Sequence, residues 1–344
     1  MKIQKNLLLT FDFELFLGSK SGSVENCLIK PTRELMKIVN NYKLSMIFFV
    51  DTLYLSRLKD VAKNSITAKN DYLKIISLLQ DLIDSGSYIF HHIHPHWLDA
   101  IYLEDINQWD VSNKNKFALN NLTKDEVVNV FDISNEIIHE IYKNRSLPKY
   151  FGYRAGGLYA QPFSNYKDQM KKHSILLEFS VLKNAKSKGE EGRYEFDYST
   201  FPSENIYNFS QEVNLKDENG EFIEFTMDNC QLSGFNKIVN SIYYRLNHKK
   251  ESWKRWGDGS SSGNVVKSSK TVSKLKGEES FSIELLNNFK ANVYFDYLKN
   301  ENFLHVISHP KFFSNANLIA LDKFLVKATS KYTIQTDVFN ILAN

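Results

Sequence analysis

Two patterns of hydrophobic and polar residues alternate along the first 160 residues of the chain. Apolar residues at helical spacing predict helices at residues 31–42, 71–86 and 123–142. Short apolar runs rich in strand formers predict β-strands at residues 6–13, 45–50, 88–96 and 150–157. Helices between successive strands imply a parallel α/β sheet, either an open doubly wound layer or a barrel. In both architectures the functional side chains lie at the carboxyl ends of the strands.

The second half of the chain follows this pattern less regularly. Further strands are predicted at residues 175–182, 222–227 and 303–310, and a closing helix at residues 316–328. Residues 247–276 are polar, serine-rich and basic, which is typical of a long loop or an insertion. We therefore expect a single domain over residues 1–344, with that insertion inside it.

Composition narrows the class of protein. The 344 residues are 42% hydrophobic with a net charge of only +3, so the chain can bury a large core and is not expected to bind nucleic acid. Cys27 and Cys230 lie far apart and fit no zinc or redox spacing, as expected for inert thiols in a reducing compartment. No apolar run is long enough for membrane insertion, and Asp12 and Glu14 interrupt the first one, unlike a signal peptide. We expect a cytoplasmic protein, whose oligomeric state the sequence does not determine.

Two acidic residues end the first predicted strand. Asp12 and Glu14 are two positions apart, so both carboxylates face the same side of an extended chain. Burying such a pair is costly unless a metal ion, a proton or a cationic side chain neutralises it. The alternative is an ordinary solvated strand end.

Four of the nine histidines lie in the segment HHIHPHW at positions 91–97. Pro95 argues against a helix, which excludes the helical type of zinc site. In an extended segment His92, His94 and His96 share one face, while His91 points away. Neutral imidazoles are good zinc ligands, although a set of packed, hydrogen-bonded histidines would give the same pattern.

Two more polar residues end predicted strands. Arg154 is followed by Gly156 and Gly157, which let the backbone pass close to a ligand, and His309 ends the late strand. Each of them alone suits a structural role. Together with the acids and the histidine cluster, they would lie close together at the carboxyl ends of the strands, which favours a metal-assisted hydrolase.

The same segments resemble motifs of a known family. LTFDFE, SMIFFVDT, GSYIFHHIHPHW, FGYRAGG and LHVISHPK are similar, in this order, to motifs of the polysaccharide deacetylase superfamily (NodB homology, carbohydrate esterase 4). The resemblance covers residues 6–160 and 303–311. It implies a distorted, seven-stranded (β/α) barrel. The chain looks most like the intracellular branch linked to capsule and O-antigen biosynthesis.

The resemblance also implies a ligand set for a divalent metal, most often zinc. Counted from Gly86, the histidines of the family motif fall on His92 and His96. Phe13 stands where the family has a second aspartate, so the carboxylate ligand is Glu14 with Asp12 as general base, or the reverse. His94 is skipped by the family pattern although it shares the predicted face.

The other implied roles concern proton transfer and the substrate. Arg154 would orient the base, and His309 would protonate the leaving sugar amine, so that an acetylated amino sugar or glycan yields acetate and a free amine. Contact with the substrate, or support of the ligands, is expected of His94, Trp97 and Tyr153. Ala155 and Gly156 stand where the family usually has a proline after the arginine of its third motif. The family's fourth motif could fall on Glu178 or Asp197.

Two alternatives remain open at the level of sequence. The altered first motif allows a metal-independent hydrolase of other non-peptide carbon–nitrogen bonds on the same barrel, such as a ureide or cyclic-imide hydrolase. A degenerate barrel that binds glycans without catalysis is the second alternative.

Overall fold

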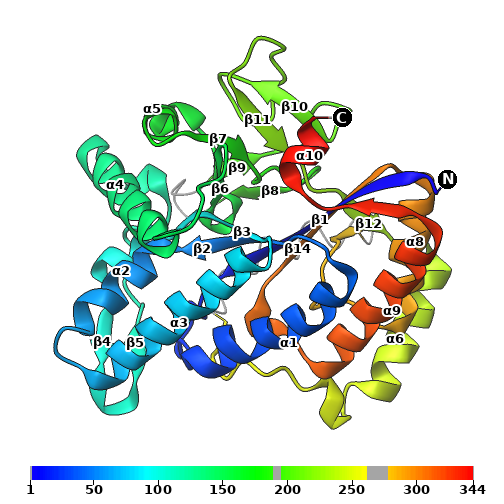
Figure 1. The fold of residues 1–344 in the computed structure, drawn as a ribbon, viewed down its shortest axis with the longest axis horizontal. Helices are drawn as coiled ribbons and strands as arrows, with labels where there is room; N and C mark the ends of the chain where they lie inside the picture. Colours follow the sequence, from blue (N-terminus) through cyan, green and yellow to red (C-terminus); the bar gives the residue numbers. More distant parts are fainter. Residues whose placement is uncertain (1, 189–194, 262–277, 344) are drawn as a thin grey trace.

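A curled, mainly parallel sheet forms the centre of the molecule (Figure 1). The computed structural model describes residues 2–188, 195–261 and 278–343. The order of pairing along the main sheet is β10-β11-β7-β6-β3-β2-β1-β14, and β15 also pairs with β1. Neighbours from β11 to β14 run parallel, whereas β10 is antiparallel to β11. Its strands are β1 (Gln4–Phe13), β2 (Ile47–Asp51), β3 (Tyr88–Ile93), β6 (Phe151–Ala155), β7 (Ile175–Glu178), β10 (Ile206–Phe209), β11 (Phe222–Phe225), β14 (Phe303–Ser308) and β15 (Thr333–Gln335).

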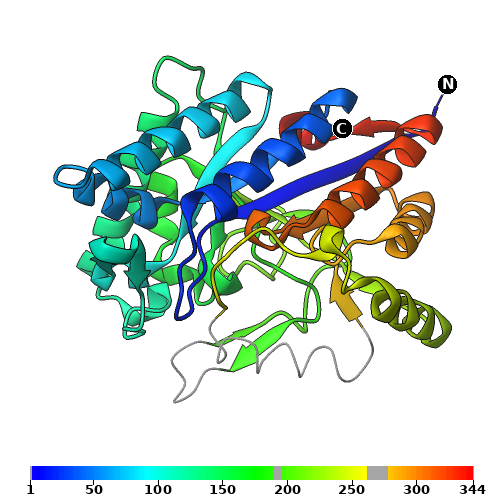
Figure 2. The same cartoon turned by 90° about the horizontal axis from the view of Figure 1, so that it is seen from below.

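Helices cover the convex side of this sheet. Figures 1 and 2 show α1, α3 and α9 lying along β1 and β2. The helices are α1 (Lys30–Val39), α2 (Thr52–Val61), α3 (Ile66–Asp84), α4 (Lys124–Ile141), α5 (Lys167–Lys172), α6 (Gly234–Asn247), α8 (Asn288–Asn300), α9 (Asn315–Lys331) and α10 (Val338–Leu342). Three two-stranded ribbons lie outside the main sheet: β4 (Ile101–Leu103) with β5 (Gln108–Asp110), β8 (Lys186–Lys188) with β9 (Glu195–Asp197), and β12 (Asn229–Gln231) with β13 (Glu278–Ser280).

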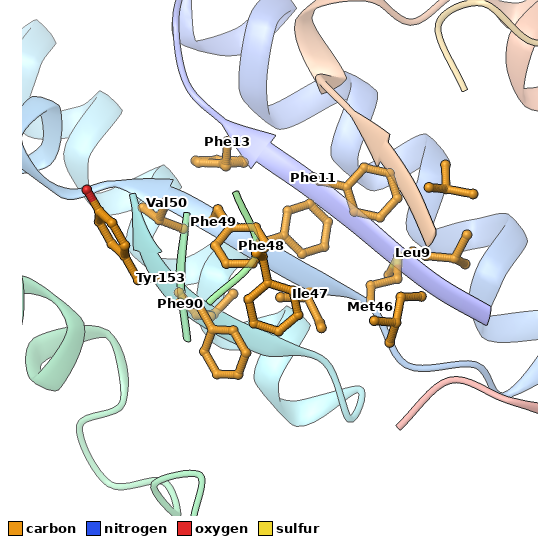
Figure 3. Packing of buried hydrophobic residues seen from close by; sticks show 14 of the residues in the cluster. Leu9, Phe11, Phe13, Met46, Ile47, Phe48, Phe49, Val50, Phe90 and Tyr153 are labelled. Carbon is orange, nitrogen blue, oxygen red and sulfur yellow. The ribbon is translucent and has the colours of Figure 1, made fainter. Parts of the chain in front are cut away.

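Aromatic side chains fill the core between sheet and helices. Phe11 of β1 stacks on Phe48 of β2 with ring centroids 4.9 Å apart, and Phe13 meets the same ring edge-on (Figure 3). Because side chains alternate along a strand, Asp12 then points to the opposite, concave side of the sheet. The packing of the phenylalanines thus fixes the direction in which the intervening carboxylate points.

Most predicted elements are present, and the parallel α/β arrangement is confirmed. The capping box before α4 forms as expected: the Thr123 amide donates to the Glu126 carboxylate at 2.9 Å. The second predicted helix begins earlier, at Ile66, where the Ser65 hydroxyl caps it. Helices α2, α5, α6, α8 and α10 were not predicted. The sheet is curled like half a barrel, with β10 and β14 at the two ends of the pairing order of the described strands.

The predicted insertion at residues 247–276 lies only partly within the described part of the chain. Residues 247–261 include a short 3-10 turn at Glu251–Trp253, and residues 262–276 lie outside the described residues. None of the described helices has both the length and the apolar character that crossing a lipid bilayer requires.

Candidate active site

Asp12 of β1 and Glu14, just past the end of that strand, lie at one cavity. The cavity has a volume of about 510 Å³ and is lined by Asp12, Glu14, His92, His94 and His309 on its polar side. Glu14 follows the last residue of β1 and keeps the alternation of the strand, so its carboxylate lies on the same side as that of Asp12. Phe117, Tyr159 and Phe196 are among the apolar residues of the opposite wall.

Three ligand atoms converge inside this cavity. Nε2 of His94 lies 2.7 Å and Nε2 of His92 lies 3.5 Å from Oε2 of Glu14, and the two Nε2 atoms are 3.0 Å apart. All three residues are buried. Among the described residues, Glu14, His92 and His94 form a group that could hold a metal ion, with one ligand atom from each within 4.8 Å of the others.

The tautomer of His92 suits a metal ligand. Its Nδ1 lies 2.7 Å from the carbonyl oxygen of Arg154, and because a carbonyl only accepts, Nδ1 must carry the hydrogen. In the neutral ring Nε2 is then left with a lone pair facing Glu14 and His94. This outer hydrogen bond, which orients a ligating imidazole, is typical of metal sites.

Lys311 holds the other oxygen of Glu14. Its ammonium group donates to Oε1 of Glu14 and to the carbonyl of Leu15, both at 2.8 Å, and the side chain is almost fully buried. The carboxylate is therefore oriented, with Oε2 directed at the two imidazoles.

Asp12 is bound by Arg154 on the adjacent side of the cavity. Nη1 of Arg154 donates to Oδ1 of Asp12 at 2.6 Å, and Nη2 donates to the Thr10 hydroxyl at 2.8 Å. The guanidinium also stacks on the ring of Phe49, 4.1 Å from its centroid. Arg154 is fully buried, so it acts on Asp12 as a rigid, permanently charged support.

His309 lies on the exposed side of both carboxylates. Its Nε2 is 3.5 Å from Oδ2 of Asp12 and 3.7 Å from Oε1 of Glu14. Its Nδ1 bonds to Oε1 of Glu284 at 3.0 Å. The side chain is 26% exposed, so this imidazole can reach a molecule in the cavity.

Charged side chains around the cavity shift the pKa values of its two acids. Burial raises the pKa of Asp12, but Arg154, His92 and His309 outweigh burial and hold that pKa below its ordinary value. Burial likewise opposes ionisation of Glu14, yet Lys311 and His94 hold its pKa well below the ordinary range. Asp12 and Glu14 are therefore both ionised at neutral pH.

The two histidines beside these acids titrate in the opposite direction. Burial lowers the pKa of His92, but Asp12 and Glu14 raise it to about 9. Burial also opposes the charge on His309, and the Glu284 carboxylate prevails and raises the pKa of that imidazole. The carboxylates thus favour a positive charge at His92, which a proton or a divalent cation can supply.

His96 is placed differently from His92 and His94. The strand ends at Ile93, and a 3-10 turn over Pro95–Asp99 carries His96 away from Glu14, to stack on Phe117. Burial lowers the pKa of His96 well below its ordinary value, so the ring is neutral. His91, expected to point away, does so and bonds to the Ser134 hydroxyl at 2.8 Å.

Trp97 and Tyr153 lie in the protein interior. Trp97 is fully buried and donates through Nε1 to Asp51, which lies next to the cluster. Tyr153 is also fully buried and packs against Phe131 and Tyr166 (Figure 3). Both side chains can support the site. Their contact with a substrate stays a prediction, and their burial argues against it.

Two functional candidates were missed in the sequence. Lys311 stands two residues after His309, and Glu284 lies within the mostly apolar segment FSIELL at residues 281–286. The candidates considered for the fourth motif lie elsewhere: Glu178 is buried beside Glu224 behind Arg154, and Asp197 is a β9 residue that binds Ser199. A lone acid inside an apolar segment was the only signal for Glu284.

The three donors fit a divalent metal. Two imidazoles and one carboxylate, with room for water or substrate, are the donor set of many catalytic zinc sites. Lys311 binds Oε1 of Glu14, whereas Oε2 and the two Nε2 atoms face one another and are available to a cation.

Comparison with known proteins shows similarity at the level of fold. No protein-family model and no curated protein matches the chain. A solved structure from Mycobacterium smegmatis, provisionally described as a polysaccharide deacetylase, is similar with a TM-score of 0.52 and 13% identity, covering 99% of this chain and 89% of that one. At this identity the likeness shows a shared fold.

Two further solved structures are similar over most of the chain, but too loosely to support an argument. One is a family 4 carbohydrate esterase from Streptomyces lividans, with 12% identity, 96% of this chain and 91% of that one covered, and a TM-score of 0.38. The other is a GH57-type branching enzyme from Pyrococcus horikoshii, with 12% identity, coverage of 100% and 70%, and a TM-score of 0.48.

Proposed function

We propose that this protein is a metal-dependent hydrolase that removes an N-acetyl or related acyl group from an amino sugar or glycan. The observation that carries the proposal is the shared cavity of three components: a metal-ligand group (Glu14, His92, His94), an ionised Asp12 fixed by Arg154, and His309 on the open side. The fold shared with the Mycobacterium smegmatis protein supports it. A role in surface-polysaccharide synthesis and a cytoplasmic location belong to the same proposal.

Glu14, His92 and His94 would hold the metal, and zinc suits them best. A divalent cation there supplies a Lewis acid and makes water more acidic near neutral pH. His96 was predicted as the second imidazole ligand from the family motif. We propose His94 for the role instead, which is supported by the 2.7 Å distance between its Nε2 and Oε2 of Glu14.

Asp12 would act as the general base. Its carboxylate is ionised, its Oδ1 is engaged by Arg154, and its Oδ2 faces the cavity and His309. Oδ2 can therefore take a proton from an attacking water. Arg154 keeps this carboxylate charged and fixes its rotamer.

His309 would act as the general acid. Glu284 favours its protonated form, and the ring is accessible from the cavity. As the amide C–N bond breaks, Nε2 can donate its proton to the leaving nitrogen. The water's oxygen ends in the acetate, and the sugar leaves as a free amine.

A direct test measures acetate release from a panel of N-acetylated sugars by the zinc-loaded protein. Asp12→Asn should lower kcat at least about a thousandfold because the base is lost, while bound zinc stays near one equivalent. Asp110→Asn, an exposed aspartate away from the cavity, is the matched control and should keep full activity. Acetate release by Asp12→Asn at the rate of the unmodified protein would refute the proposed mechanism.

One observation favours a second candidate, a metal-independent carbon–nitrogen hydrolase. Lys311 already places a positive charge 2.8 Å from Glu14, so part of the charge that a metal would balance is supplied by the chain itself. Stoichiometric zinc in the purified protein and loss of activity on chelation would exclude this candidate. A non-catalytic glycan-binding role would be excluded by acetate release that disappears in Asp12→Asn.

A further inference from the structure

Helix α6 presents its apolar side to solvent. Along this helix Phe235, Ile238, Ile242 and Leu246 recur at intervals of three and four residues, which sets them on one face. Their exposed fractions are 74%, 61%, 52% and 73%. We call these four residues the α6 stripe. A surface helix normally turns such a stripe toward the core.

The opposite side of α6 attaches the helix to the molecule through polar contacts. Asn287 donates to the side chain of Asn240 at 2.9 Å, and Asn288 donates to the Tyr243 hydroxyl at 3.1 Å. Ser233 caps the first turn by accepting from the Asn236 amide at 3.2 Å. The helix is thus fixed to the body by its polar side. Figures 1 and 2 both show it projecting at the periphery.

The charged residues of α6 and of the three residues after it are all of one sign. Residues 234–250 contain Lys237, Arg245, Lys249 and Lys250 and no acidic residue. All four basic residues are exposed. Trp253 follows the helix and packs against Tyr243, with ring centroids 5.8 Å apart. An exposed apolar face bordered by basic and aromatic residues is typical of a helix that lies in the interface of an anionic lipid bilayer.

We propose that α6 docks this protein onto an anionic membrane surface. The α6 stripe would enter the boundary between headgroups and acyl chains, and the basic residues would contact lipid phosphates without any segment crossing the bilayer. Docking of this kind needs no change in the fold, since the stripe already faces outward.

A second copy of the chain is a less suitable occupant. In a pairing of α6 with itself, the basic residues of each copy would meet no acidic residue of the other helix, since residues 234–250 contain none. Like charges at close range oppose that pairing, whereas phosphate groups complement it.

The docked helix would bring the cavity near the lipid surface. β12 ends at Gln231, three residues before α6 begins at Gly234, and β12 pairs with β13. Asn229 of β12 and Ser280 of β13 line the cavity that holds the candidate catalytic residues. This consequence rests on the proposed function, but membrane docking itself does not.

Vesicle flotation with the full-length protein tests the proposal. The protein should bind vesicles of phosphatidylcholine with about a third phosphatidylglycerol at least tenfold more tightly than vesicles of pure phosphatidylcholine, and added salt should weaken the binding. The double variant Phe235→Ser/Ile242→Ser should bind at least tenfold more weakly. The double variant Lys249→Glu/Lys250→Glu, at the end of the helix where folding is least affected, should weaken binding to a similar extent.

A matched control removes exposed apolar residues from other helices. Ile66→Ser/Ile319→Ser, at positions 70% and 51% exposed on α3 and α9, should bind within twofold of the unmodified protein. Binding unaffected by both α6 variants, or absent from anionic vesicles for the folded protein, would overturn the proposal. So would self-association in sedimentation equilibrium that Phe235→Ser/Ile242→Ser abolishes. Deacetylase activity is not part of this test, so its outcome is independent of the proposed function.

Discussion

Pro95 decides which histidines face the acids of β1. Up to His94 the chain is extended, so His92 and His94 point to the same side as Glu14. Pro95 begins a 3-10 turn, and the alternation on which a shared face for His96 depended ends there. Because of the turn that begins at Pro95, His94 is a candidate metal ligand, whereas the His96 ring stacks on Phe117.

Replacing His94 and His96 separately distinguishes the two candidate ligands. His94→Ala should weaken zinc binding at least about a hundredfold, because a direct ligand is lost, whereas His96→Ala should change it less than about threefold. Isothermal titration with zinc, and the visible spectrum of the cobalt-substituted protein, measure this directly. The opposite order of effects would assign the ligand role to His96.

Glu284 should set the alkaline limit of activity. Because Glu284 raises the pKa of His309, it keeps the proposed general acid protonated to higher pH, and activity is lost as pH rises through that pKa. In Glu284→Gln the alkaline limb of the kcat/KM profile should move to lower pH, with kcat reduced about tenfold. Glu279→Gln alters another carboxylate at the cavity, one that pairs with Lys290, and should leave the limb in place. An unmoved limb in Glu284→Gln would remove His309 from the acid role.

At the scale of elements, the site depends on how closely the backbone after β6 passes the end of β3. Ala155 pairs with Ile93 at the ends of the two strands, and the next residue is Gly156. A Cβ atom at Gly156 would lie 2.7 Å from Nδ1 of His94 and 2.7 Å from the carbonyl oxygen of Ile93. The backbone can only pass beside His94 because no side chain is there.

Gly156→Ala should therefore disturb both the fold and the metal site. The backbone carbonyl of Ile93 cannot move cheaply, so we expect a loss of about 1–3 kcal/mol of stability in urea unfolding, together with weaker zinc binding. Gly234→Ala is the control, since a Cβ there meets nothing within 4 Å. Equal stability of the two variants would show that the loop after β6 adapts freely.

The sequence predicted this element arrangement better than the contacts within it. Strands, helices and the strand-end positions of Asp12, Arg154 and His309 follow from periodicity, because burial imposes one repeat on strands and another on helices. The contacts of Lys311 and Glu284 could not be predicted, since they depend on how turns after the strands fold back. Helix α6 was also missed: no element was predicted at residues 234–247, and the apolar positions of this helix face solvent.

At the scale of the whole molecule, the site joins segments that are distant along the chain. Asp12 and Glu14 come from β1 and its end, His92 and His94 from β3 and its end, and Lys311 from the turn after β14. A cation bound by Glu14 and the two histidines links β1 to β3 across β2, which pairs with both. Binding of this kind stabilises the folded state only, since the ligands are not assembled in the unfolded chain.

Zinc should accordingly raise the melting temperature of the metal-free protein. At a free zinc concentration about a hundred times Kd the gain is about 2.7 kcal/mol, which for a chain of this length corresponds to roughly 4 °C. His92→Ala should abolish the shift, because a ligand is missing, even if its own melting temperature is lower. His173→Ala removes a histidine that bonds to Asp132 on α4, away from the cavity, and should keep the full shift. Differential scanning calorimetry with and without zinc measures all three proteins. An equal shift in His92→Ala would mean that the stabilising ion binds elsewhere, and the metal site at Glu14 would have to be abandoned.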